Sequence, residues 1–124
     1  MNSQEFFNEL QRASELMKNE KYLEAIKILD NLKEIERQGD FDYSLTHKLY
    51  QLISNSHSLL NQQIILEILN NYNENQLSFK QLAEKLKDTK KLDLDEANVR
   101  KEVELLILRG KLNCRLDGDL IVLK

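Results

Sequence analysis

The stretch that decides the fold is residues 77–124, LSFKQLAEKLKDTKKLDLDEANVRKEVELLILRGKLNCRLDGDLIVLK. Ser78 and Gln81 have the spacing of a capping box, in which two side chains satisfy the free backbone N–H groups at a helix start. Apolar residues then recur every three or four positions, which is typical of a short helix. Asp93 and Glu96 have the same capping-box spacing and precede a second, longer apolar stripe. The stretch therefore predicts two successive helices.

A hairpin follows these helices. Gly110 can take the left-handed conformation that ends the second helix. Asp117-Gly118 is a dipeptide suited to a two-residue type I′ turn between two short alternating runs. A first strand around Gln76–Ser78 is expected to pair with the last strand of the chain. Strand, helix, helix and hairpin in this order predict a winged-helix region with a short β-hairpin wing.

The register of the hairpin predicts which side chains face the core and which face outward. With Asp117-Gly118 as the turn, one face carries Leu112, Cys114, Leu116, Ile121 and Leu123. On the other face Leu120 pairs with Arg115 and Val122 pairs with Asn113. Two outward apolar residues can mark a contact surface, and the strand 112–116 is expected at the edge of the sheet. The candidate partner-binding residues are Leu112, Cys114, Leu120 and Val122.

The N-terminal part predicts helices only. One helix covers residues 3–18, and a second runs from about residue 22 to Gly39, which forms an αα-hairpin with the first. The segment 20–29, EKYLEAIKIL, resembles the middle of a tetratricopeptide repeat (TPR), in which a small residue, here Ala25, lets two helices approach closely. No second copy follows at the period of an array.

Two further helices are expected before the winged-helix region. The first begins at Asp40 or Asp42 and ends near Ile53, because Ser54-Asn55-Ser56 indicates a break or kink. The second covers residues 58–72 and is apolar on nearly all sides, as a buried helix is. The sequence thus predicts a helical, TPR-like region over residues 1–55 and a winged-helix region over residues 56–124, which together form one compact unit.

Composition limits the class of protein. The chain has 124 residues, 41% of them apolar, with no proline and three glycines, which suits helices joined by brief turns. Its one cysteine excludes an internal disulfide framework. The N-terminal residues lack the pattern of a signal peptide and no apolar run approaches a membrane span, so we expect a cytoplasmic protein with no membrane partner.

No pattern of catalytic or cofactor-binding residues stands out. His47, His57 and Cys114 do not share a metal-ligand spacing. Cys114 alternates into the predicted core face, where a free cysteine behaves as a small apolar residue. No glycine-rich phosphate loop or nucleophile elbow occurs. We therefore expect no enzyme activity, no cofactor, no metal and no small-molecule substrate.

Binding of nucleic acid is the main alternative. Many winged helices read DNA with their second helix, on which Asn98, Arg100, Lys101 and Arg109 can contact bases and phosphates. Glu102 and Glu104 are also expected on the exposed side of that helix and would repel phosphate. Residues 56–124 carry eleven basic and eleven acidic side chains, and the wing tip Asp117-Gly118-Asp119 is acidic. Both observations disfavour DNA, because phosphate binding needs an excess of basic residues.

Other charged and apolar groups near this helix have two interpretations. A basic cluster of Lys85, Lys87, Lys90 and Lys91 precedes it and is read as a solvated loop. Leu105 and Leu108 lie off the main apolar stripe. They are expected in the core against the long helix 58–72, with a partner contact as the alternative.

Residues 57–124 resemble the PCI domain, the scaffold of the proteasome lid, the signalosome and translation initiation factor three. The residues that carry the resemblance are LSFKQLAEKL at 77–86, LILRGKLNCRLD at 106–117 and GDLIV at 118–122. The resemblance implies stacked helix pairs followed by a winged helix, and a non-catalytic scaffold subunit that assembles with partner proteins through that winged helix. A winged-helix transcriptional regulator and a winged-helix adaptor in ubiquitin-like ligation or endosomal sorting are the alternatives.

Overall fold

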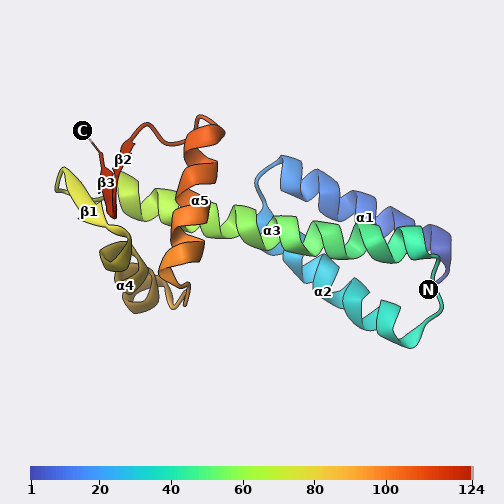
Figure 1. Ribbon diagram of the computed structural model, residues 1–124. Coiled ribbons are helices and arrows are strands. Elements are labelled where there is room, and N and C mark those ends of the chain that lie inside the picture. The colour runs from blue at the N-terminus through green and yellow to red at the C-terminus, as the bar shows by residue number, and fades with distance from the viewer. Residues whose placement is uncertain (124) are drawn as a thin grey trace. The chain divides into compact units, whose positions relative to one another are not determined.

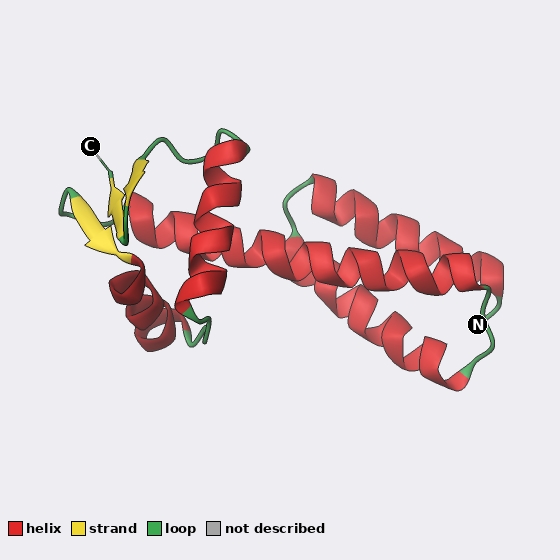
Figure 2. Ribbon diagram, viewed as in Figure 1, coloured by secondary structure: helices red, strands yellow, loops and turns green. Residues whose placement is uncertain are grey.

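The structure is a computed structural model that describes residues 1–123, and it is mainly helical, as the sequence predicts. Its elements in chain order are α1 (Ser3–Lys18), α2 (Tyr22–Gln38), α3 (Tyr43–Asn70), β1 (Gln76–Ser78), α4 (Phe79–Lys90), α5 (Glu96–Leu108), β2 (Arg115–Asp117) and β3 (Leu120–Val122) (Figure 1). Figure 2 distinguishes the helices from the short strands by colour. The chain divides into two compact units, one from Met1 to Leu60 and one that begins at Asn61. The sequence placed this division between residues 55 and 56.

The first unit contains α1, α2 and the first half of α3. Figure 1 shows α1 and α2 running in opposite directions, and these two helices pack against each other. Their fully buried side chains include Phe6, Ala25 and Leu29, and Leu49 of α3 joins the same core. Of the adjacent phenylalanines Phe6 is buried, whereas Phe7 is exposed.

The turn between α1 and α2 closes without a glycine. Glu20 takes the left-handed conformation, with φ of 61°. The Glu20 N–H donates to the Met17 carbonyl at 3.1 Å and the Lys21 N–H to the Leu16 carbonyl at 2.9 Å. This is the Schellman pattern of helix ends, in which the left-handed position is normally glycine.

Gly39 ends α2 for a different reason. Its φ of −118° suits any residue. A Cβ at this position would lie 2.5 Å from the Phe41 ring, and the Phe41 ring packs on Phe6 with ring centroids 4.5 Å apart. Glycine is therefore required here by the close approach of a core aromatic ring.

The predicted break at residues 54–56 is wrong, because α3 is one continuous helix from Tyr43 to Asn70. Ser56 is fully buried, and its hydroxyl donates to the carbonyl of Ile53 within the helix at 3.0 Å. A serine hydroxyl that bonds to its own helix in this way is compatible with a helix interior. Tertiary burial of α3 outweighs the weak helix propensity of Ser54-Asn55-Ser56.

The second unit contains the three-stranded antiparallel sheet, in the order β1-β3-β2. The expected pairing of Gln76–Ser78 with the last strand is confirmed. The predicted hairpin register is wrong: Leu116 lies opposite Ile121 and Asp117 opposite Leu120. The two turn residues are therefore Gly118 and Asp119, with positive φ at Gly118 and not at Asp119. A type II′ turn has glycine at this first position, whereas type I′ needs positive φ at both.

Hydrogen bonds between residues close in sequence fix where the helices of the second unit begin and end. Ser78 and Gln81 form the predicted capping box of α4, with reciprocal bonds of 3.0 and 2.8 Å. The cap of α5 is Asp95, whose carboxylate accepts from the Asn98 N–H at 2.7 Å, and not Asp93. Gly110, with φ of 72°, ends α5 in a Schellman motif as predicted.

The core of the second unit draws on all of its helices and on the sheet. Its buried residues are Ile65, Leu69, Leu77, Phe79, Leu82, Leu86, Val99, Val103, Leu106, Leu112 and Ile121. None of them belongs to the core cluster of the first unit. The described residues therefore form two separate hydrophobic cores, and α3 contributes to both.

The continuity of α3 can be tested at Ser54, which is exposed. Ser54→Pro should lower the free energy of unfolding by about 3 kcal/mol or more, because proline in a helix interior removes a backbone bond and clashes with the preceding turn. Ser54→Ala is the control and should change it by less than about 0.5 kcal/mol. Urea unfolding followed by circular dichroism measures both, and equal stability of the two variants would show that the helix breaks here.

Candidate functional site

The outer face of the sheet carries the two outward apolar residues that the sequence singled out. Leu120 and Val122 are half-buried on the central strand β3. The residues beside them on this face are polar: Gln76, Ser78, Arg115 and Asp117. We call these six residues the outer sheet face. An apolar centre within a polar rim is the pattern of a protein-contact surface, and here the apolar centre consists of two side chains.

The other two candidate contact residues lie in the core. Leu112 is only 9% exposed and belongs to the buried cluster of the second unit. Cys114 packs against the same cluster, and partial burial raises the pKa of its thiol above the ordinary value. Neither residue lies in a regular strand, since β2 begins at Arg115. A partner could reach Leu112 only by opening the core, so Leu120 and Val122 are the surface candidates.

The edge strand β2 is protected against pairing with another strand. It contains three residues, and two of them, Arg115 and Asp117, are charged and exposed. Short strands with charged side chains are a common way in which proteins block edge-to-edge association. The outer sheet face is therefore a better contact candidate than the edge.

The two arginines predicted to reach nucleic acid bond within the chain. Arg100 donates from Nη1 to the Gly118 carbonyl at 3.1 Å and forms an ion pair with Glu104 at 3.4 Å. Its guanidinium also lies 5.0 Å from the centre of the Phe79 ring, so it links α5 to the hairpin turn and to α4. Arg109 donates to the side-chain oxygen of Gln62. Asn98 and Lys101 are exposed on α5, and Arg109 is also exposed directly after it.

Glu102 was expected on the exposed side of α5, and that expectation is wrong. Glu102 is 5% exposed and Gln62, on α3, is 3% exposed. The Gln62 amide donates to the Glu102 carboxylate at 3.3 Å and accepts from Arg109, so one buried glutamine connects two charged side chains. The sequence signal was present, because residue 102 lies three positions after Val99 and four before Leu106, both buried.

Leu108 was expected in the core, and that expectation is also wrong. Its side chain is 81% exposed at the last residue of α5, while Leu105 is half-buried. Exposure of one leucine is common in proteins. Here it falls on the helix whose arginines are already bonded, so this end of α5 presents an apolar side chain rather than a free cation.

The basic cluster before α5 was expected in a loop, and that expectation is wrong, because Lys85, Lys87 and Lys90 lie in α4. The cluster is also partly neutralised. Lys90 forms an ion pair with Glu67 at 2.9 Å, and the Lys85 ammonium lies 5.3 Å from the centre of the Tyr72 ring. Lys87 and Lys91 are exposed. Of the four lysines, two therefore contact groups of the same unit.

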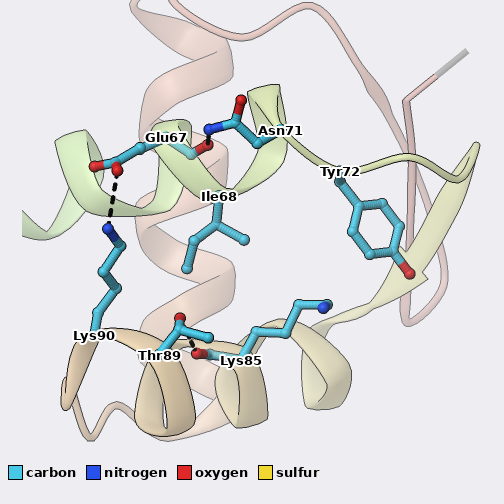
Figure 3. A pocket seen from close by; sticks show the side chains of 7 residues that line it. All are labelled: Glu67, Ile68, Asn71, Tyr72, Lys85, Thr89 and Lys90. Atoms are coloured by element: carbon cyan, nitrogen blue, oxygen red, sulfur yellow. Dashed lines mark hydrogen bonds and ion pairs between the residues drawn. The ribbon is translucent and has the colours of Figure 1, made fainter.

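These contacts surround a shallow hollow of about 210 Å³ between α4 and the end of α3 (Figure 3). Ile68 points into it, and the polar residues around it bond mostly to one another. The Asn71 amide donates to the Glu67 carbonyl, and the Thr89 hydroxyl donates to the Lys85 carbonyl. Burial and then the hydrogen bond to Glu74 raise the pKa of Tyr72. The hollow therefore offers no converging set of polar groups for a ligand.

The described part of the chain holds no cluster of metal-binding side chains. Within residues 1–123, no group of three or more histidine, cysteine, aspartate or glutamate side chains is placed to hold a metal ion. None of the helices described here is both long enough and apolar enough to cross a membrane. Comparison with known proteins found no matching family model, no similar curated protein and no similar solved structure.

The buried Gln62 bonds predict a measurable contribution to stability. Gln62→Leu should lower the free energy of unfolding by about 1–3 kcal/mol, because Glu102 loses a donor and Arg109 loses an acceptor. Gln63→Leu changes an exposed glutamine on the same helix and should stay within about 0.5 kcal/mol of the wild type. Thermal or urea unfolding of both variants checks this, and equal effects would contradict a structural role for the buried glutamine.

The raised pKa of Cys114 predicts slow thiol chemistry. Only the thiolate attacks a disulfide reagent, so at pH 8 a thiol with a raised pKa reacts more slowly than a free cysteine does. The rate should rise when the chain is unfolded in urea and when the pH is increased. Cys114 is the only cysteine, so the colour released from an aromatic disulfide reports on it alone. Equal rates in the folded and unfolded chain would contradict its placement against the core.

Proposed function

We propose that this chain is a non-catalytic protein–protein interaction subunit, with a TPR-like helical hairpin in its first unit and a winged helix in its second. The element order α4, α5, β2, β3 supports the winged helix, as does the addition of β1 to the sheet beside β3. The fully buried Ala25 supports the TPR-like hairpin, because a small residue in the core lets α1 and α2 approach closely. This combination is the one that the resemblance to the PCI domain implies.

The surface of α5 carries the proposal. In winged helices that bind DNA, the corresponding helix presents basic side chains to the groove. Here Arg100 is bonded to the hairpin turn, Arg109 is bonded to Gln62, and Leu108 is 81% exposed at the end of the helix. Equal numbers of basic and acidic residues after position 60 leave no excess positive charge for phosphate. A surface without excess positive charge suits a protein partner better than it suits phosphate.

The contact surface that we propose is the outer sheet face, with Leu120 and Val122 at its centre. Both residues are half-buried, so their side chains are already partly ordered by the sheet. A partner can bury them at a small cost in side-chain conformational entropy. A non-catalytic scaffold subunit in a larger assembly and an adaptor of ubiquitin-like ligation or endosomal sorting would both use a surface of this kind.

A DNA-binding regulator is the second candidate, because Asn98 and Lys101 are exposed on α5. These two side chains could contact a base and a phosphate. They lie on the same helix as the exposed Glu104, which would repel the phosphate backbone.

The two candidates separate in a binding experiment. We expect no detectable binding to labelled generic duplex DNA at low salt, measured by fluorescence anisotropy. Binding that weakens steeply as salt is raised would favour the regulator, because it reports the release of counterions from phosphate. Light scattering in the same buffers gives the mass of the species that binds.

Binding to a protein partner is tested by affinity capture with the intact chain immobilised. A partner retained by the wild type should be lost with the double variant Leu120→Lys and Val122→Lys, because two ammonium groups would be placed in an apolar contact. Leu23→Lys, at an exposed apolar position of the first unit, should retain it. Each variant must melt cooperatively like the wild type. Retention by the double variant would exclude the outer sheet face.

A further inference from the structure

The exposed face of α3 in the first unit differs from the other helix surfaces of that unit. Between residues 43 and 60 its exposed residues are Tyr43, Ser44, His47, Lys48, Tyr50, Gln51, Ser54, Asn55 and His57. One of these nine is formally charged when histidine is counted as neutral. Helix α1 also has nine exposed residues, and four are charged; α2 has nine, and six are charged. A helix face that lacks charge in a highly charged protein is unusual for a surface in contact with water only.

The same face is rich in aromatic residues at regular spacing. Residues 43, 47, 50, 54 and 57 alternate by four and three positions, which keeps them on one side of a helix as a continuous seam. Tyr43 is 80% exposed and stacks on His47, with ring centroids 6.0 Å apart and ring planes 18° apart. Tyrosine enrichment together with charge depletion marks the central part of protein interfaces.

The margins of this face carry opposite charges. The Glu36 carboxylate on α2 accepts from the Thr46 hydroxyl at 3.5 Å and from the Tyr50 hydroxyl at 3.2 Å. It is therefore held beside α3 at the height of residue 48. Lys48 lies two positions from Thr46, and residues two apart on a helix point to nearly opposite sides. Lys48 thus forms one margin of the face and Glu36 the other.

We propose that this face of α3 binds a second copy of the chain, with the two α3 helices side by side and parallel around a two-fold axis. In a symmetric pair each copy offers the same patch to the other. When the two-fold axis is parallel to the two α3 helices, Lys48 of each copy lies beside Glu36 of the other copy. The dimer then contains two such contacts between opposite charges. The seam lies on the Glu36 side of the face and adds no like-charge contact, because it contains tyrosine, histidine and serine.

The size of the face indicates a weak dimer. Fifteen residues of helix extend roughly 22 Å at about 1.5 Å per residue. A single helix face of this length buries less than the roughly 800 Å² per partner of a standard interface. We therefore expect a dissociation constant in the micromolar range or weaker, so that mass depends on protein concentration.

A nucleic acid is the competing occupant, since bases can stack on tyrosine and histidine. The first unit carries ten acidic and seven basic residues, which disfavours phosphate. The choice of a second copy rests on the complementary margins, for which a nucleic acid has no counterpart.

The first experiment measures mass by sedimentation equilibrium from low micromolar to near-millimolar concentration. The wild type should pass reversibly from monomer to dimer. Tyr43→Glu should weaken the dimer by about tenfold or more, because each copy places a carboxylate in the seam. Leu23→Glu, at an exposed apolar residue of α2, should leave the dimer unchanged. A monomer at every concentration, or a dimer insensitive to Tyr43→Glu, would overturn the proposal.

The second experiment tests the parallel arrangement by exchanging charges. Lys48→Glu alone and Glu36→Lys alone should each weaken the dimer by roughly 3- to 30-fold, because two contacts per dimer become like-charge contacts. An equimolar mixture of the two variants should restore association as a heterodimer, in which both contacts again pair a carboxylate with an ammonium group. Failure of the mixture, with both variants folded, would overturn the parallel pairing. Binding of a labelled single-stranded oligonucleotide that Tyr43→Glu abolishes would assign the face to nucleic acid instead.

Discussion

One helix, α3, must satisfy two hydrophobic cores. Leu49 and Leu52 are buried with α1 and α2, whereas Ile65 and Leu69 are buried with α4, α5 and the sheet. Each half of the helix therefore needs an apolar stripe of its own. Of its 28 residues, Lys48 and Glu67 alone are formally charged with histidine neutral.

The sequence predicted elements well wherever the deciding interaction is local. A capping box needs only two side chains three residues apart, so the start of α4 could be read directly from Ser78 and Gln81. The left-handed end of α5 at Gly110 depends on one glycine, and strand β1 was also placed correctly. The coarse result, helices with a small antiparallel sheet, follows from such local signals.

Predictions failed where a distant interaction decides. Ser54-Asn55-Ser56 has the composition of a break, but it lies inside α3, where Ser56 is fully buried and bonds to the Ile53 carbonyl. The hairpin register depends on a choice between two adjacent turn dipeptides that share Gly118, and the chain uses the second. In the candidate site, the outward side of Leu120 and Val122 was predictable, because both registers keep the same alternation along β3. The burial of Glu102 required knowledge of Gln62, which lies forty residues earlier.

The division between the two units falls at Leu60 and Asn61, inside α3, so no loop joins them. Proteases cut most readily at exposed loops, which in the described part of the chain are the connections at residues 19–21, 39–42, 71–75, 91–95, 109–114 and 118–119. Cleavage at any of these positions would leave one unit without part of its own core rather than release two intact units. A chain built in this way would be degraded or retained as a whole, and its two halves could be exchanged with other proteins only by a cut through a helix.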